Sequence, residues 1–136
     1  MPGTCNSTVT WFPSTEALNV KRWNMLHPTA PARASYLEQV LQMEQGAFVA
    51  VSDYMKIIPD QIAPWVPGGL MALGTDGFGR SDTRPALRRY FEIDAESVVV
   101  ATLYALAAKG QVKRQVVERA IKELHLDPEK LFPVCV

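Results

Sequence analysis

The stretch that decides the fold is residues 47–101, AFVAVSDYMKIIPDQIAPWVPGGLMALGTDGFGRSDTRPALRRYFEIDAESVVVA. Two short apolar runs within it, Ala47–Ser52 and Leu70–Leu73, are each followed by a loop and then by residues with helical spacing. Strand, loop and helix repeated in tandem are typical of an α/β layer with parallel strands. The first run is apolar almost throughout, as in a strand that is covered on both faces. We therefore predict an α/β fold built around these two strands.

Capping residues, glycines and apolar spacing set the bounds of the predicted helices. Upstream, we expect a strand at Thr8–Phe12, a helix from a Ser14 or Thr15 cap to Asn24, and a helix at Ser35–Glu44 closed by Gly46. Further on, we expect a helix capped by Asp53 and interrupted at Pro59, then a helix at Thr83–Phe91 capped by Asp82. Two more helices follow. We expect the most buried helix at Ala95–Lys109, capped by Asp94 and ended by Gly110, and an amphipathic helix at Lys113–Leu124.

The chain has 136 residues and a formal net charge of zero, with 14 basic and 14 acidic side chains. This charge balance gives no global attraction to nucleic acid or anionic lipid. The basic cluster Arg84, Arg88 and Arg89 is most simply a solvated helix face, with a phosphate patch as the minor alternative. No apolar run approaches the ~18 residues of a membrane span. We expect residues 1–7 to be a disordered or poorly packed lead-in and residues 8–136 to form a single, truncated domain.

The cysteines and histidines indicate no complete active site. Cys5 and Cys135 lie near opposite ends without metal-ligand spacing, which predicts two reduced thiols. His27 and His125 each follow a helical pattern, so we expect both to interact with a helix C-terminus. Neither cysteine has a histidine nearby in the sequence, and no serine lies in a nucleophile-elbow motif.

The glycine-rich loop 74–81 lies between a predicted strand and a predicted helix, where backbone amides can cradle phosphate. Its order, G-x-x-G-x-G without a following lysine, matches neither the dinucleotide fingerprint nor a Walker loop. The favoured interpretation is a loop whose glycines allow positive φ angles and close backbone approach. Asp76 and Asp82 are a candidate acid–base pair, but a loop hydrogen bond for Asp76 and a helix cap for Asp82 are simpler roles.

Several long motifs together resemble one known family. They are residues 49–56 (VAVSDYMK), 59–62 (PDQI), 64–68 (PWVPG) and 73–82 (LGTDGFGRSD), with 20–28 (VKRWNMLHP) upstream and 87–95 (LRRYFEIDA) downstream. They are similar to the C-terminal domain of the homodimeric, bacterial-type pyruvate dehydrogenase decarboxylating component. That enzyme belongs to the transketolase-like superfamily of thiamine diphosphate enzymes. The resemblance runs from about Val9 to Phe132.

The resemblance implies a three-layer α/β/α domain with a mostly parallel sheet, which supports a dimer. In the family, thiamine diphosphate and its Mg²⁺ are bound by two preceding domains, so the resemblance implies no catalytic, cofactor-binding or metal-binding residue in this chain. The glycine-rich loop becomes a candidate contact with neighbouring domains. Its candidate residues are Gly74, Thr75, Asp76, Gly77, Phe78, Gly79, Arg80 and Asp82.

The resemblance also implies partners. These are the remaining domains of the same enzyme, a second copy in a homo-oligomer, and the dihydrolipoyl acetyltransferase component. No nucleic acid or membrane is implied, and the resemblance implies a cytoplasmic location and a link to glycolysis.

Family members carry an additional strand and helix before the position of Thr8. The strand lies between those corresponding to Thr8–Phe12 and Ala47–Ser52, and this sequence does not supply it. A fragment, a truncated gene product and one chain of a split enzyme all fit this difference. Because a missing strand leaves an unpaired sheet edge, we expect either that the remaining strands close up or that another copy fills the gap.

Three functional hypotheses follow. The first is the C-terminal domain of a pyruvate dehydrogenase that decarboxylates pyruvate with thiamine diphosphate and acetylates lipoamide, with an architectural role for this chain. The second is a stand-alone binding or assembly module that has kept the fold without the enzyme. The third is a small phosphate-binding enzyme that uses the glycine-rich loop.

Overall fold

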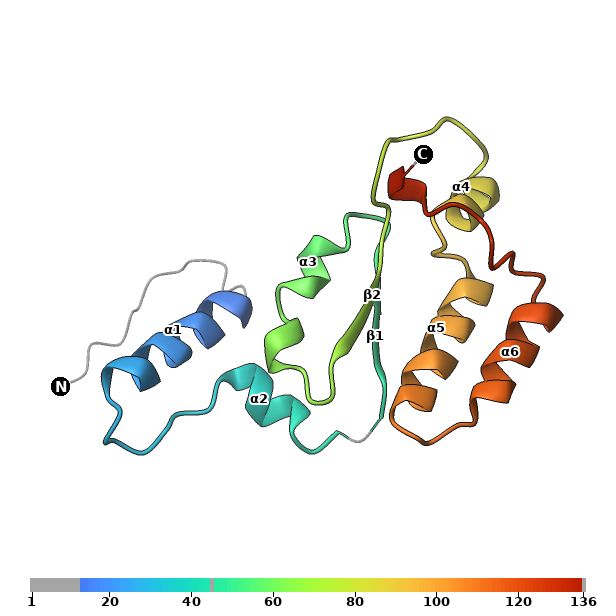
Figure 1. The fold of residues 1–136 in the computed structure, drawn as a ribbon. Helices are drawn as coiled ribbons and strands as arrows, with labels where there is room; N and C mark the ends of the chain where they lie inside the picture. Colours follow the sequence, from blue (N-terminus) through green and yellow to red (C-terminus); the bar gives the residue numbers. More distant parts are fainter. Residues whose placement is uncertain (1–12, 45, 136) are drawn as a thin grey trace. The chain divides into compact units, whose positions relative to one another are not determined.

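A computed structural model describes residues 13–44 and 46–135 of the chain and divides it into two compact units, residues 1–43 and 44–136 (Figure 1). The expected lead-in at residues 1–7, the strand predicted at Thr8–Phe12, and Cys5 lie outside the described residues. One domain over residues 8–136 stays a prediction.

The first unit contains helices α1 (Pro13–Leu26) and α2 (Tyr36–Leu41). Ser35 begins α2 with a capping box, in which its hydroxyl accepts from Glu38 N at 3.3 Å and its N–H donates to Glu38 Oε2 at 2.7 Å. The two helices are joined by Glu16, whose Oε2 accepts a hydrogen bond from Tyr36 N at 3.0 Å.

Two predicted helix ends in this unit are wrong. Helix α1 already begins at Pro13, so Ser14 and Thr15 lie inside it rather than at its cap. Proline is favoured at the first helical position, because the N–H it lacks would have no intrahelical partner there. Helix α2 ends at Leu41, well before Gly46. None of its residues is buried, so no packing supports a longer helix.

The C-terminus of α1 is the place where His27 was expected to act, and the structure confirms this. His27 Nδ1 lies 2.9 Å from the carbonyl oxygen of Trp23, in the last turn of the helix. The two rings stack with their centroids 4.4 Å apart, and the Arg33 guanidinium lies 3.6 Å from the Trp23 centroid. Ring stacking and a cation–π contact thus stabilise the C-terminus of α1.

The second unit is built on two parallel strands, β1 (Phe48–Val51) and β2 (Leu70–Leu73), which confirms the predicted pair. Their register pairs Phe48 with Leu70 and Val51 with Leu73. Helix α5 (Ala95–Ala108) packs on both strands, and α3 (Ile57–Asp60) contacts β2. Figure 1 shows α3 and α5 on opposite sides of the strands, so the layers are those of an α/β fold.

Helix α6 (Arg114–Glu123) packs against α5, while α4 (Arg84–Tyr90) leads from the glycine-rich loop into α5. Asp94 begins α5 as predicted, because its Oδ1 accepts from Ser97 N at 3.1 Å. Gly110, with φ of +74°, lets the chain leave α5 as predicted. Short 3₁₀ turns complete the unit, at Ala63–Trp65 and Pro133–Cys135.

Two other predicted caps are wrong. Helix α3 begins at Ile57 after Lys56, not at Asp53, because the backbone of residues 53–56 bonds to the loop that follows β2. The cap of α4 is Thr83, one residue beyond Asp82. Asp82 Oδ1 accepts a hydrogen bond from Thr83 N at 2.7 Å instead.

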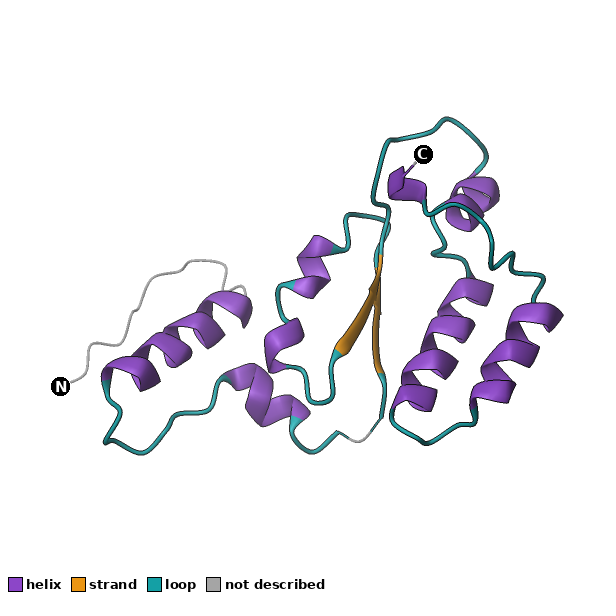
Figure 2. Cartoon of the chain, viewed as in Figure 1, coloured by secondary structure: helices purple, strands orange, loops and turns teal. Residues whose placement is uncertain are grey.

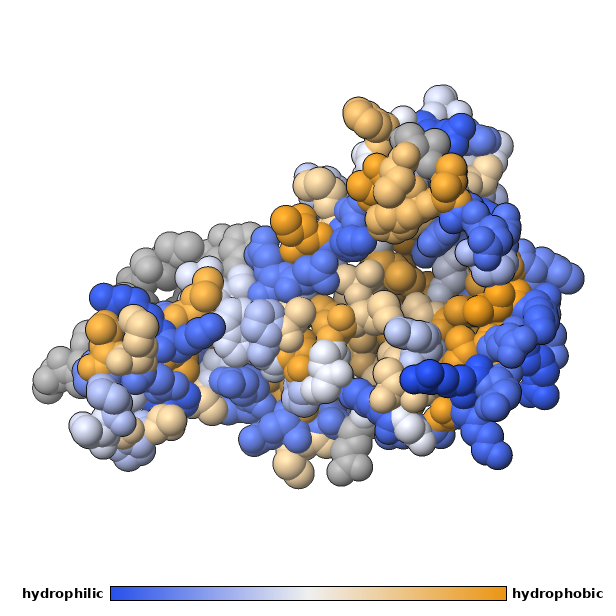
Figure 3. All heavy atoms as spheres, viewed as in Figure 1, coloured by the Kyte–Doolittle hydropathy of each residue, from blue (hydrophilic) through white to orange (hydrophobic). Residues whose placement is uncertain are grey.

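The apolar core is thinner than the sequence suggests. Helix α5 was predicted to be the most buried, yet Ser97 is its one buried residue, and Val99 and Tyr104 are 45% and 58% exposed. Within the described residues of this unit, buried apolar side chains are confined to Val66, Ile93, Val117 and Pro133. Apolar surface accordingly shows between the charged side chains in the space-filling view (Figure 3).

Lys109, directly after α5, holds the starts of both strands. Its ammonium donates to the carbonyl oxygen of Gly46, before β1, and to that of Pro67, before β2, at 3.5 Å. The ammonium also lies 5.4 Å from the centroid of the Phe48 ring. One charge therefore connects three segments that are far apart in the sequence.

We predict that Lys109→Met lowers the free energy of unfolding by about 1 kcal/mol, because charge-assisted hydrogen bonds are lost at a partly exposed site. Urea denaturation followed by circular dichroism measures this difference. Lys113→Met is the matched control, since Lys113 is exposed and precedes α6. Equal stability of the two variants would contradict the role given to Lys109.

Candidate functional site

The carboxyl ends of β1 and β2 form one edge of the sheet, because parallel strands end on the same side. Ser52 N donates to Leu73 O at 3.0 Å, which extends the pairing one residue past β1. The glycine-rich loop leaves this edge and runs to α4 (Figure 2). In open α/β sheets, ligands bind beyond this edge, which makes it the candidate functional site.

Gly74 is required where the loop begins. A Cβ at this position would lie 2.5 Å from Lys56 N and 2.6 Å from Tyr54 O, both of them backbone atoms. The next residue fastens the same contact, since Thr75 N donates to Tyr54 O at 3.0 Å and Thr75 Oγ1 donates to Asp53 O at 3.1 Å. The segment after β1 and the loop after β2 are therefore one interlocked structure.

Asp76 makes the loop hydrogen bond that was predicted for it. Its Oδ1 accepts from Lys56 N at 3.1 Å, and its Oδ2 lies 3.3 Å from Lys56 Nζ. The Asp76 side chain is 20% exposed and that of Lys56 is 38% exposed. Backbone and side chain of one lysine thus bind the Asp76 carboxylate, whereas Asp82 Oδ1 accepts from Thr83 N.

The second half of the loop meets the segment Leu131–Cys135, which we call the strap. A Cβ at Gly77, where φ is +97°, would lie 2.8 Å from the carbonyl oxygen of Pro133. Pro133 is buried, and the Lys56 ammonium lies 4.8 Å from the Phe132 ring centroid. The strap therefore lies across the carboxyl edge of the sheet.

Exposed apolar side chains surround the contact between loop and strap. Phe78, next to Gly77, is 82% exposed, and on the strap Leu131 is 70% exposed. Phe132 and Val134 flank Pro133, and each is 47% exposed. We call these four residues the apolar cap. Exposed apolar clusters of this kind mark interaction surfaces.

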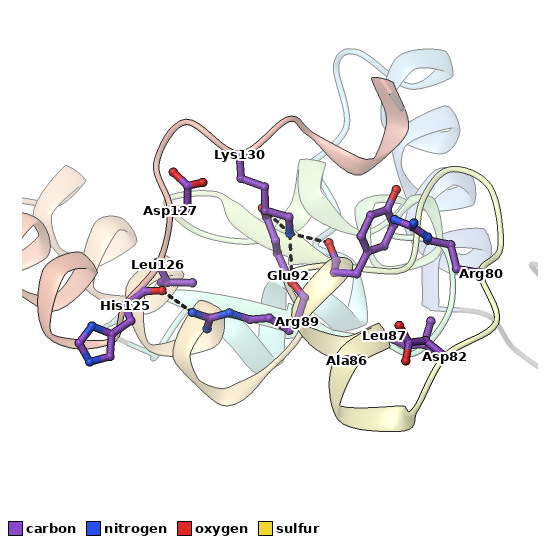
Figure 4. A pocket seen from close by; sticks show the side chains of 11 residues that line it. Arg80, Asp82, Ala86, Leu87, Arg89, Glu92, His125, Leu126, Asp127 and Lys130 are labelled. Atoms are coloured by element: carbon purple, nitrogen blue, oxygen red, sulfur yellow. Dashed lines mark hydrogen bonds and ion pairs between the residues drawn. The ribbon is translucent and has the colours of Figure 1, made fainter.

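A hollow of about 410 Å³ lies beside the cap and is lined by charged groups (Figure 4). Lys130 Nζ donates to Arg89 O at 3.0 Å, to Tyr90 O at 2.7 Å and to Glu92 Oε1 at 3.2 Å. The Arg80 guanidinium from the loop lies 4.4 Å from the Tyr90 ring centroid. The Lys130 charge is thus used to hold the chain together.

The prediction of a solvated basic face is confirmed for Arg84 and Arg88, which are exposed, but it is wrong for Arg89. Arg89 donates to Asp94 Oδ2 at 2.9 Å and to the carbonyl oxygens of Leu124 and His125, at 3.3 and 2.6 Å. The guanidinium thus joins the start of α5 to the end of α6. His125 accepts through its backbone, and Figure 4 shows its ring turned away from Arg89.

The contacts of the Asp94 carboxylate depend on pH. Burial alone would raise the pKa of Asp94, but hydrogen bonds from Ser97 and Arg89 together with the Arg89 charge outweigh it and lower the pKa. The charged form is therefore the one that stabilises the fold.

Among the predicted loop residues, Gly77 meets the strap, Arg80 lies over the Tyr90 ring and Asp82 accepts from Thr83 N. Gly74, Thr75 and Asp76 are fixed against the segment after β1, while Phe78 and Gly79 extend into solvent. The sequence did not indicate the strap or Lys130, because their partners lie 38 or more residues away and no local pattern marks such contacts.

The described residues do not fit a metal-bound diphosphate. Among them no group of three His, Cys, Asp or Glu side chains converges on one point. At the carboxyl edge, Asp76 is paired with Lys56 and Glu92 with Lys130. We therefore derive no chemical step through thiamine diphosphate from these residues. No helix in residues 13–44 or 46–135 is long and apolar enough to cross a membrane.

Comparison with known proteins places this fold in a family. The family described as "Transketolase-like TK C-terminal domain" matches residues 4–94. The chain belongs to this family. The pyruvate dehydrogenase E1 component of Pseudomonas aeruginosa is 47% identical over 120 residues, which cover 88% of the chain. Those of Mycobacterium tuberculosis and Escherichia coli K12 are each 46% identical, over 87% and 83% of the chain.

The chain spans only 13–14% of the length of these relatives. The matches confirm the resemblance to the C-terminal part of the pyruvate dehydrogenase E1 component. The transketolase-like domain fits the observed helices and parallel strands.

We predict that Gly74→Ala lowers the free energy of unfolding by about 1–3 kcal/mol, because the added methyl group meets backbone atoms that cannot turn away. Gly79→Ala is the matched control, since a Cβ there meets nothing within 4 Å. Chemical denaturation of both variants measures the difference. A Gly74→Ala variant as stable as Gly79→Ala would show that the interlock at the sheet edge is loose.

We predict that acid destabilises the fold partly through Asp94. Because its pKa is lowered in the folded state, its contribution is present above the unfolded value of about 3.9 and is lost as pH falls through the folded value. Asp94→Asn keeps a capping side chain but removes the charge. Its stability should depend less on pH below about 5 than that of the unmodified chain, as thermal melts between pH 3 and 7 would measure; an unchanged slope would contradict the assignment.

Proposed function

We propose that the chain serves as the C-terminal domain of a pyruvate dehydrogenase E1 component. The parent enzyme would oxidatively decarboxylate pyruvate with thiamine diphosphate and Mg²⁺ and pass the acetyl group to lipoamide on the dihydrolipoyl acetyltransferase component. The proposal is supported by 46–47% identity over most of the chain to proteins of that name. In this role the chain is a non-catalytic part of the enzyme.

The observation that carries the architectural role is the arrangement of the loop at the carboxyl edge. Its first half is fixed by Gly74, Thr75 and Asp76, and its second half presents Phe78 at 82% exposure beside the strap. A loop that is fixed at its start and exposes a Phe side chain suits a contact that is buried on assembly, because burying that side chain contributes about 1.5–3 kcal/mol. We infer that the apolar cap contacts the remaining domains of the enzyme.

The wider partners follow from the same proposal. A second copy of the enzyme would complete a homodimer, the location would be the cytoplasm, and the reaction would be linked to glycolysis. These statements rest on the likeness to the pyruvate dehydrogenase E1 component.

A chimera tests the proposed function. The matching segment of the Pseudomonas aeruginosa relative is replaced by this chain, and the relative without that segment serves as the control. We expect the chimera to assemble and to decarboxylate pyruvate, the control to fail, and the chain alone to show no turnover with pyruvate, thiamine diphosphate and Mg²⁺. Turnover by the chain alone would contradict the proposal. A folded chain that cannot support the chimera would favour the stand-alone module.

This chain and the relative without the matching segment, mixed as separate polypeptides, test the role of the apolar cap. We predict that Phe78→Ser weakens assembly about ten- to a hundredfold, the equivalent of one buried aromatic side chain. Met43→Ser is the control, since Met43 is 81% exposed and lies outside the cap. Analytical ultracentrifugation across a concentration series measures assembly, and equal effects of both substitutions would refute the assignment of the cap.

A further inference from the structure

The strap Leu131–Cys135 covers the carboxyl edge of the sheet, and its main contact is made by Pro133. Pro133 is its buried residue, and the carbonyl oxygen of Pro133 lies where a side chain at Gly77 would be. The Phe132 ring adds a cation–π contact to the Lys56 ammonium, 4.8 Å from the ring centroid. Beneath the strap, the remaining space is about 40 Å³, and its walls include Lys56, Gly74 and Asp76.

The strap is held lightly compared with the residue before it. Its other large side chains are about half or more exposed, and its backbone hydrogen bond, from Cys135 N to Phe132 O at 2.8 Å, lies within the strap itself. Lys130, by contrast, donates to three oxygen atoms on Arg89, Tyr90 and Glu92. A firmly anchored residue thus adjoins a segment with little burial, as at the hinge of a segment that opens locally.

We propose that the strap is a displaceable lid over the carboxyl edge, closed in this structure, which opens about Lys130. Opening breaks the packing of Pro133 on Gly77 and the cation–π contact between Phe132 and Lys56. The Lys56–Asp76 pair, 38% and 20% exposed when the strap is closed, then becomes more exposed at the edge where α/β sheets bind ligands, and the loop loses the cover that keeps its hydrogen bonds to residues 54–56 closed. The chain therefore has two states, one with the loop held against the strap and one with the loop free.

The lid also bears on assembly. A loop held by the strap presents Phe78 in one arrangement, whereas a released loop can adapt to a neighbouring domain. That consequence rests on the proposed function. The lid itself does not, because its motion is a property of this chain alone and is measured on it.

Hydrogen exchange on the full 136-residue chain tests the lid. The reporters are the Lys56 amide, which donates to Asp76 Oδ1, and the Thr75 amide, which donates to Tyr54 O. We expect Phe132→Ala to speed exchange at both amides about tenfold, which corresponds to about 1.4 kcal/mol. Leu131→Ala is the matched control, because Leu131 is in the same strap but 70% exposed, and it should leave both rates unchanged.

The Val98 amide, which donates to Asp94 O in α5, reports on global unfolding and should not change in either variant. Pro133→Ala provides a second variant that should act as Phe132→Ala does. Equal exchange rates in Phe132→Ala and Leu131→Ala would overturn the lid. So would faster exchange at Val98 to the same degree in both Phe132→Ala and Pro133→Ala, since the strap would then be an integral part of the fold rather than a cover. Failure of the chimera with an intact exchange result would count against the proposed function only.

Discussion

The parallel pairing of β1 with β2, and the close backbone approach that continues it past both carboxyl ends, is the constraint on which the rest of the second unit depends. The ladder runs in register from Phe48 and Leu70 to Ser52 and Leu73. Beyond it, Gly74 brings the loop against Tyr54 and Lys56 at a separation that no side chain would allow. Because the two segments interlock, the direction of the loop, and through it the positions of α4 and the apolar cap, is set at this edge.

Charged side chains bonded to backbone carbonyl oxygens hold the rest of this unit together. Lys109 reaches Gly46, 63 residues away, and Lys130 reaches Arg89 and Tyr90, 41 and 40 residues away. Arg89 in turn reaches Leu124 and His125. Such bonds are stronger than those between neutral groups, and they complement a core in which few apolar side chains are buried. Substituting one of these cations therefore removes hydrogen bonds that connect distant segments of the chain.

The same thin core leaves apolar side chains at the surface. Those of the cap gather at the one edge where loop, strap and strands meet, and Val99 and Tyr104 remain exposed on α5. A family member that spans 13–14% of its relatives' length would cover such surface with other parts of the enzyme in the proposed assembly. Exposure, in that assembly, marks contact surfaces rather than a poorly packed fold.

By itself the sequence determined the two strands, the helices on either side of them, the caps of α5 and the family. Each of these leaves a local record, such as the apolar runs at Ala47–Ser52 and Leu70–Leu73, Asp94 before a helical pattern, or a long motif at residues 73–82. The tertiary structure alone decided where α3 and α4 begin, the role of Arg89, and the place of the strap over Gly77. Lys56 meets Asp76, 20 residues away, and Arg89 reaches Leu124 and His125, 35 and 36 residues away. A local pattern of residue types carries no information about which distant backbone will approach.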